Sequence, residues 1–556
     1  MSARTRTILI AGLSVCIVGA MLIGALPLIP YEGDGIGIAN GIHDSLHEVF
    51  TNISPVAYNY DVQCGVNVIV KLVALATGGD VWTVFSLMTI AAAMVFVLFS
   101  VRAATALFGK ESALPALAAC ILFPEAIVSA YYPNSLIFAA AFLALGLYLY
   151  VDGRSHWILP AIALGCAFWM RVDVVLAFPA FVFLRRDAKA VRPFWIMALM
   201  FGVSGIVGLG LLTLSDVSVL RLLHSSGAHL QGSVEESQGL PMGLGSRAFR
   251  TLLAFFPVLT VLVLVLGVVT LVRTRRIPLV LAGLLPLVIM LLVQRANLTT
   301  PKYLVYSIPF LMLCVIPALV HVTPGWFRSH RVLSVLLVLL SLQVVLGVRL
   351  LFRGKEYIEA PGSLQRASIT LVPLGVKEMP GRAIERVELV VGGGSKINTD
   401  DENRLTSGLV YTPWCWREEK VMVVENVAKL RALVREDRRD TLRVVASSFC
   451  NSARQLMRWV MREEGFTYGT AYGALGPGVE CYVNGSRTVV LQQIVYERDG
   501  PSSYIGAVGE LPPGEVVFVS NIPWEVSFVA SLPAHYPRIG DLGFRIADRG
   551  DTHPLQ

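Results

Sequence analysis

Residues 8–48 read ILIAGLSVCIVGAMLIGALPLIPYEGDGIGIANGIHDSLHE, a long apolar run followed at once by an acidic loop. The run from Ile8 to Leu28 is long enough to cross a bilayer as one helix. The loop over 30–48 contains four carboxylates and two histidines but no Lys or Arg. An acidic cluster beside hydrocarbon is costly unless the protein uses it. We therefore interpret this loop as the centre of a functional site at the membrane surface.

The composition divides the chain into an apolar part and a part with the composition of a soluble domain. Hydrophobic residues fill 55% of the 556 positions and charged residues only 15%, against roughly 25% charged residues in soluble domains. The deficit lies in residues 1–354, so we predict a transmembrane domain there and a soluble domain over 355–556. The net charge of +7 comes largely from short basic loops. Because no basic patch is interleaved with aromatics, nucleic-acid binding is not expected.

Apolar segments predict a polytopic α-helical membrane protein with about 11 spans and a cytoplasmic N-terminus. The first span follows a basic start and is expected to be an uncleaved helix rather than a signal peptide. Residues 156–184 are too long for one helix and carry Arg171 and Asp173, so we predict two short helices that meet there. The C-terminal domain then lies outside the cytoplasm. The expected spans are 8–29, 81–101, 113–130, 134–151, 157–170, 173–184, 193–214, 249–272, 277–293, 303–322 and 331–352.

The soluble domain alternates strand patterns with helix patterns, which predicts an α/β fold. Strands are expected in RVELVVGGGSK, TLRVVASSF, TVVLQQIVYE and EVVFVS, and helices in ENVAKLRALVRE and NSARQLMRWVMREEG. Four cysteines would face an oxidising compartment, where disulfides can form in one of three pairings. These are Cys64, Cys415, Cys450 and Cys481.

Asp34 is the first candidate for chemistry. An ionised carboxylate there could accept the proton of an attacking hydroxyl, although a solvated turn between two glycines also explains the residue. His43 and His47 would share one helix face, which suits a metal ion. The two histidines lack a third ligand, and an amphipathic interfacial helix explains them as well. We therefore expect no metal site.

Ionisable residues within predicted spans are the second group of candidates. Glu125, Arg171 and Asp173 lie at depths where such residues usually pair or line a cavity. They could contact a substrate, or Arg171 could form an ion pair with Asp173 or Glu125 that only holds the fold. On the outer side, Arg295 and Lys302 could bind a lipid phosphate or could simply anchor head groups.

Five features follow one another along the chain: the acidic loop after the first helix, IGIANGI (36–42), YYPNSLIFAAAFLALGLYLY (131–150), ALGCAFWMRVDVVLAFP (163–179) and PKYLVYSIPFL (301–311). In this order they resemble the GT-C superfamily of integral membrane glycosyltransferases, in the branch of the protein O-mannosyltransferases and the lipid A aminoarabinose transferases. The sequence departs from the family at two places. Glu32-Gly33-Asp34 replaces the compact Asp-Glu of the family, and Asn134 stands where members often have Asp.

The resemblance implies an inverting transfer of a hexose or pentose from a polyprenyl-phosphate carrier. The acceptor would be a hydroxyl of a glycan, lipid or protein on the outer face of a cell membrane, and the short loops favour a bacterial source. Asp34, or Glu32 in its place, would be the general base. Arg295, Lys302 and Tyr303 would bind the carrier.

The resemblance also implies that Glu125, Arg171 and Asp173 contact the substrate. It implies no cofactor, although some related enzymes bind a divalent cation. Other interpretations stay open. A lipid or polysaccharide transporter or flippase would bury charges in the same way, and a surface-polysaccharide ligase or polymerase would use similar carriers. A structural membrane protein would tolerate the loss of all these residues.

Overall fold

The computed structural model of the chain contains two compact units, which are described separately. Unit 1 comprises Met1–Leu28, Asn59–Leu351 and Asp401–Arg417, and unit 2 comprises Ile29–Tyr58, Phe352–Asp400 and Glu418–Gln556. The boundary expected between 354 and 355 stays a prediction. The structure describes residues 3–30, 33–43, 64–123, 125–154, 156–184, 194–202, 258–293, 305–326, 384–389, 413–447, 452–469, 479–499, 502–507, 516–520 and 544–547.

Unit 1 is helical, and its helices begin and end at local sequence signals. Asp80 caps α5, because its carboxylate accepts a hydrogen bond from the main-chain nitrogen of Thr83 at 2.8 Å. Gly109 and Gly153, with φ of 89° and 68°, end α5 and α8. The helices are α1 (Ala3–Ala25), α4 (Cys64–Thr77), α5 (Val81–Phe108), η1 (Lys110–Ser112), α6 (Ala113–Leu122), α7 (Glu125–Val128), α8 (Leu136–Asp152), α9 (Ile158–Met170), η2 (Val172–Phe183), α13 (Val258–Arg273), α14 (Ile277–Val293) and α15 (Ile308–Trp326).

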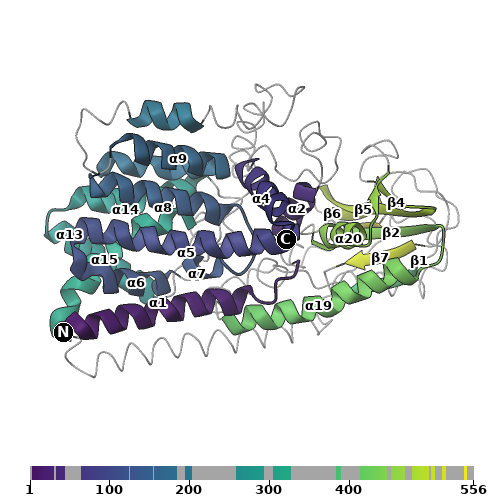
Figure 1. Ribbon diagram of the computed structural model, residues 1–556, viewed down its shortest axis with the longest axis horizontal. Helices are drawn as coiled ribbons and strands as arrows, with labels where there is room; N and C mark the ends of the chain where they lie inside the picture. The colour runs from purple at the N-terminus through teal and green to yellow at the C-terminus, as the bar shows by residue number, and fades with distance from the viewer. Residues whose placement is uncertain are drawn as a thin grey trace. The chain divides into compact units, whose positions relative to one another are not determined.

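The packing of these helices leaves an apolar outer surface. α8 contacts both α5 and α9, and α15 contacts both α13 and α14, as Figure 1 shows. Val15 and Leu75 are each 71% exposed, and Leu199 is 68% exposed. Large apolar side chains in such positions are costly in water but not in hydrocarbon. Among the described residues, two helices are long and apolar enough to cross a bilayer, Arg4–Ala25 and Val81–Phe108, and seven shorter apolar helices accompany them. This surface supports a membrane location for unit 1.

The helices depart from the expected spans at three places. α4 occupies Cys64–Thr77, where no helix was expected. The span expected over 113–130 is divided into α6 and α7, since α6 ends at Leu122 and its C-cap residue, Phe123, precedes a proline. The span expected over 173–184 is the 3₁₀ helix η2, which contains Pro179. The span over 193–214 is described only over 194–202, and the span over 331–352 lies outside the described residues.

Close helix crossings around Cys314 depend on glycine. A Cβ added at Gly267 would lie 1.8 Å from the carbonyl oxygen of Cys314, and one added at Gly283 would lie 2.2 Å from its Sγ. We expect Gly267→Ala to lower the free energy of unfolding by about 1–3 kcal/mol, because the main chain of α15 must move. Thermal unfolding in detergent measures this loss. The control is Gly12→Ala on α1, where a Cβ meets nothing within 4 Å. Equal melting of the two variants would contradict the prediction.

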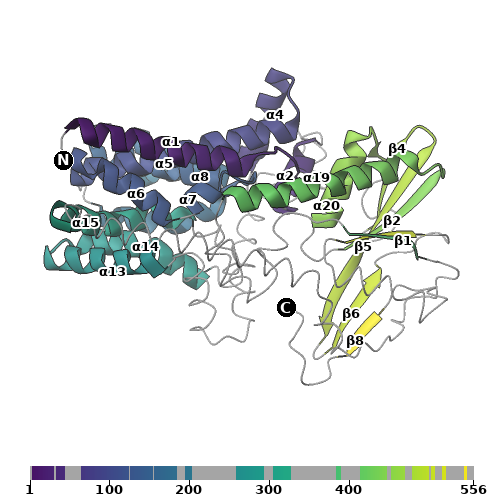
Figure 2. The same ribbon diagram turned by 90° about the horizontal axis from the view of Figure 1, so that it is seen from below.

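Unit 2 contains an eight-stranded sheet with the order β1-β7-β2-β5-β4-β3, in which β6 pairs with β5 and β8 pairs with β6. The pairs β1–β7, β7–β2 and β2–β5 are parallel and the others are antiparallel. Figure 2 shows β6 and β8 at the far end of the long strand β5. The strands are β1 (Ile384–Leu389), β2 (Thr441–Ser447), β3 (Thr467–Tyr468), β4 (Val479–Asn484), β5 (Arg487–Asp499), β6 (Ser502–Ala507), β7 (Val516–Ser520) and β8 (Phe544–Ala547).

Three helices contribute to unit 2: α2 (Gly33–His43), α20 (Ser452–Glu463) and the part of α19 (Pro413–Glu436) that follows Arg417. α20 packs on β2 and β7 and buries Leu456, Trp459 and Val460. The four strands and two helices expected from the sequence coincide with β1, β2, β5, β7, α19 and α20. The strands β3, β4, β6 and β8 were not expected.

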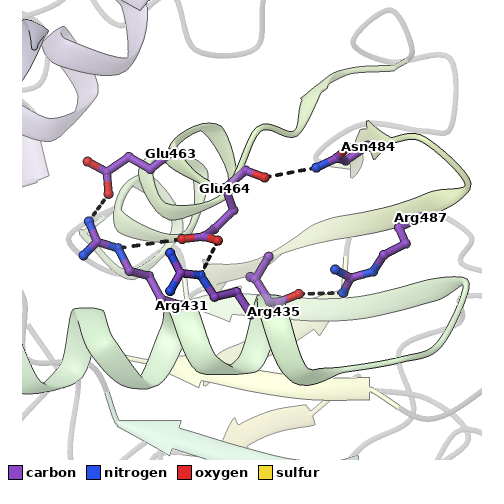
Figure 3. A network of polar contacts seen from close by, with 7 residues as sticks. Arg431, Arg435, Glu463, Glu464, Asn484 and Arg487 are labelled. Atoms are coloured by element: carbon purple, nitrogen blue, oxygen red, sulfur yellow. Dashed lines mark hydrogen bonds and ion pairs between the residues drawn. The ribbon is translucent and has the colours of Figure 1, made fainter.

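A network of exposed ion pairs joins α19 to α20 (Figure 3). Arg431 pairs with Glu463, and Arg435 Nε donates to Glu464 Oε2 at 2.5 Å. The hydrogen bond that Arg435 donates to Glu464 raises the pKa of its exposed guanidinium. Arg487 on β5 donates to the carbonyl oxygen of Val434 at 2.5 Å. These contacts fix α19 against the β4–β5 hairpin.

Candidate functional site

The acidic loop after α1 contains the start of helix α2. Asp34 is the second residue of this helix and His43 is its last residue. The stretch IGIANGI lies within this short helix. Glu32 and His47 lie outside the described residues, so their roles stay predictions. The first turn of a helix favours a negative charge, because unpaired main-chain N–H groups and the helix dipole face it.

A second group of polar residues is buried in unit 1. Glu125 opens α7, is 3% exposed, and accepts a hydrogen bond from the hydroxyl of Tyr132 at 3.2 Å. The turn that follows is held by Asn134, whose Oδ1 accepts from the main-chain nitrogen of Ile137 at 3.1 Å. Its amide donates to the carbonyl oxygen of Tyr132, also at 3.1 Å. Asn134 thus shapes the YYPN turn, which is a structural task that an Asp in its place could share only in part.

Four side chains from three parts of the chain form what we call the Arg171 cluster: Ser135, Arg171, Asp173 and Tyr306. Arg171 Nε lies 3.1 Å and 3.0 Å from the two carboxylate oxygens of Asp173, and its Nη1 donates to Ser135 Oγ at 2.9 Å. The hydroxyl of Tyr306 donates to Asp173 Oδ1 at 2.9 Å. The ion pair that the sequence allowed between Arg171 and Asp173 is present.

Backbone geometry positions this cluster. Arg171 ends α9 in an extended conformation, with φ −165° and ψ 125°, and η2 begins immediately after it. Arg171 and Asp173 are separated by a single residue, and their side chains meet directly. Ser135 precedes α8 but makes no side-chain cap for that helix, because its hydroxyl oxygen accepts from Arg171 instead.

The burial of the cluster sets its energetics. Arg171 is 9% exposed and Asp173 is 2% exposed, so both ions have lost most of their hydration. Burial of this kind is tolerated only when the charges are paired and hydrogen-bonded. The two carboxylate oxygens of Asp173 receive Arg171 and Tyr306, which together compensate the lost water. The arrangement can present a guanidinium whose charge and direction are fixed.

Tyr306 and Ser135 are the members of the Arg171 cluster that the sequence analysis missed. Tyr303 was named because the resemblance implies that it binds the carrier, whereas the described ring whose hydroxyl donates to Asp173 is that of Tyr306. Arg295, Lys302 and Tyr303 lie outside the described residues and stay predictions.

Removal of the Tyr306 hydroxyl tests how much the cluster stabilises unit 1. We expect Tyr306→Phe to lower the free energy of unfolding by about 1.5–3 kcal/mol, because a buried carboxylate loses a hydrogen-bond donor. Thermal unfolding in detergent measures the effect. The matched control is Tyr148→Phe on α8, where the ring stacks on Phe99. A Tyr306→Phe chain that melts with the wild type would show that Asp173 does not depend on this donor.

Two further predictions concern a metal site and disulfide bonds. Among the described residues, no three His, Cys, Asp or Glu side chains gather in a way that could hold a metal ion. Of the cysteines considered for disulfides, Cys481 is a free thiol, while the side chains of Cys64, Cys415 and Cys450 are not described.

No family model and no curated protein matches the chain. Among solved structures, ArnT from Cupriavidus metallidurans bound to undecaprenyl phosphate matches with 11% identity and a TM-score of 0.46, over 82% of this chain and 85% of that one. Its apo form matches with 12% identity and a TM-score of 0.42 over the same shares. An oligosaccharyltransferase from Archaeoglobus fulgidus, in complex with Zn and sulfate, matches with 14% identity and a TM-score of 0.40, over 59% and 51%.

Proposed function

We propose that the chain is a membrane glycosyltransferase that moves a sugar from a polyprenyl-phosphate carrier to an acceptor hydroxyl on the outer face of the membrane. The observation that carries the proposal is the Arg171 cluster, a paired and hydrogen-bonded set of charges inside an apolar helix bundle. Buried charges in such a bundle are rare and usually serve a substrate pathway or site. We assign the general base of the reaction to Asp34, in the first turn of α2.

The proposed step is an inverting displacement. The acceptor oxygen attacks the anomeric carbon while the Asp34 carboxylate takes its proton, so that Asp34 becomes a neutral acid. The bond between the anomeric carbon and the phosphate oxygen breaks, and its electron pair leaves with the phosphate. One displacement inverts the anomeric centre. Glu32 is the second candidate for the base.

Negative charge grows on the departing phosphate, and cations placed there lower the barrier. Arg295 and Lys302, with Tyr303 beside them, are the proposed phosphate ligands. Arg171 is already bound to Asp173, so we assign it and Glu125 to the wall of the substrate site rather than to the phosphate itself. The chain would lie in a cell membrane with several spans and with its C-terminal residues outside the cytoplasm.

The experiment is a transfer assay on the purified full chain in vesicles. A polyprenyl-phosphate sugar, labelled in the sugar, is supplied with candidate acceptors, and released polyprenyl phosphate is measured beside glycosylated product. The proposal expects the two products in equal amounts and an inverted anomeric configuration by NMR. If the labelled lipid instead crosses the vesicle membrane with its sugar–phosphate bond intact, the chain is a transporter.

A further inference from the structure

Helix α2 belongs to the same compact unit as the α/β sheet. Its segment Ile29–Tyr58 groups with Glu418–Gln556 in unit 2, and α2 packs directly on α20. All eight residues from Gly35 to Ile42 are buried. An isolated helix at a membrane surface would leave one face in water or head groups. The helix that contains Asp34 is therefore a packed element of the α/β unit.

One polar contact fixes α2 on α20. The side chain of Asn40 is fully buried, and its Nδ2 donates to two oxygens of Gln455, the main-chain carbonyl oxygen at 2.9 Å and Oε1 at 3.0 Å. Gln455 is itself only 1% exposed. Both hydrogens of a buried amide thus point at one residue, and sliding or rotation of α2 would leave them unpaired. Unpaired buried donors are costly, so this contact sets the position of α2 along α20.

The partner helix is itself anchored to the sheet. Arg458, one turn after Gln455, donates from Nε to Glu480 Oε2 on β4 at 2.8 Å. Arg454, the residue before Gln455, lies 3.6 Å from Glu480 Oε1. Gln455 is therefore flanked by two contacts to the same buried carboxylate, and its position in space follows from that of β4.

We infer that Asn40 and Gln455 are positioning residues, and that the α/β unit serves the enzyme by holding the helix that carries Asp34. The inference rests on the proposed function, because it gives that carboxylate its place. It assigns the C-terminal residues a task that the sequence left open. The task needs neither acceptor binding nor attachment to the cell envelope.

The test uses Gln455→Met in the full chain, which keeps the length of the side chain and removes Oε1. Gln455→Glu keeps an acceptor at that place and should restore much of the lost function. Glu463→Gln, on the same helix but facing Arg431 of α19, is the matched control. We expect Gln455→Met to lower kcat about 10–100-fold with KM for the donor little changed, because a small displacement of a catalytic group is costly.

Hydrogen exchange gives a readout that does not depend on catalysis. Amides of α2 should exchange about 3–10-fold faster in Gln455→Met than in the wild type, since the helix loses one hydrogen bond of its anchor. In Glu463→Gln the exchange of α2 and the kcat should match the wild type.

Three outcomes overturn the inference. Unchanged exchange in α2 shows that Gln455 does not hold it. Faster exchange with an unchanged kcat shows that the position of α2 does not matter for transfer, while the proposed function stands. A wild-type chain that transfers no sugar overturns the proposed function and the inference with it, and that failure is visible before any variant is compared.

Discussion

Asp34→Asn is expected to reduce sugar transfer by about 10²–10⁴-fold, because the amide keeps the size of the side chain but cannot accept the proton of the acceptor hydroxyl. Binding of the donor should change little, so the loss should appear in kcat rather than in KM. Initial rates with a labelled polyprenyl-phosphate sugar measure both effects.

Two variants make the result specific. Asp152→Asn makes the same chemical change at the end of α8, away from the acidic loop, and should transfer at the wild-type rate. Glu32→Gln tests the second carboxylate of the Glu32-Gly33-Asp34 sequence. If Asp34→Asn transfers normally and Glu32→Gln does not, the base is Glu32, and Asp34 is a residue of the first helical turn without a part in the proton transfer.

The sequence was informative wherever a contact joins residues that are close along the chain. Arg171 and Asp173 are two residues apart, so their pairing could be predicted from their position between two apolar segments. The other members of the cluster could not be predicted. Ser135 is 36 residues from Arg171, and Tyr306 is 133 residues from Asp173. Only the folded helix bundle brings them together.

In unit 2, too, the sequence predicted local elements but not the contacts between distant residues. α20 was predictable because Leu456, Trp459 and Val460 recur at the spacing of one helix face. The position of α2 was not, since Asn40 and Gln455 are separated by 415 residues. The run IGIANGI contains only one polar side chain that could reveal a partner. Helix α4 was also missed, although its 14 residues equal the length of the span expected over 157–170.

Glu480→Gln is expected to produce the largest loss of stability in unit 2, about 3–5 kcal/mol, because it leaves a buried guanidinium without its counter-ion. Arg458 and Glu480 both have fully buried side chains. The hydroxyl of Tyr482 donates to the same carboxylate at 2.9 Å. Because the Arg458 side chain has no exposed surface, water cannot compensate its charge once the carboxylate is lost.

The pH dependence of the same pair has a definite sign. Burial alone would raise the pKa of Glu480, but the charge and hydrogen bond of Arg458, followed by Arg454, hold it below its ordinary value of 4.5. The unfolded chain therefore binds a proton more readily than the folded one. The stabilisation is complete above the ordinary pKa and is lost as the pH falls through the lowered pKa. Glu480→Gln removes this acid dependence.

Hydrogen exchange of α20 and β4 amides in rising denaturant reports the free energy of unfolding for unit 2 without interference from the helix bundle. The matched control is Glu463→Gln. Glu463 is also on α20, and its ion-pair partner is Arg431 of α19, whose side chain is 40% exposed. Exposed pairs contribute about 0–1 kcal/mol, so the control should lie near the wild type. The double variant Arg458→Met with Glu480→Leu should recover part of the loss, because paired apolar side chains leave no unmatched charge between them. Equal losses for Glu480→Gln and Glu463→Gln would mean that burial does not decide the strength of these pairs.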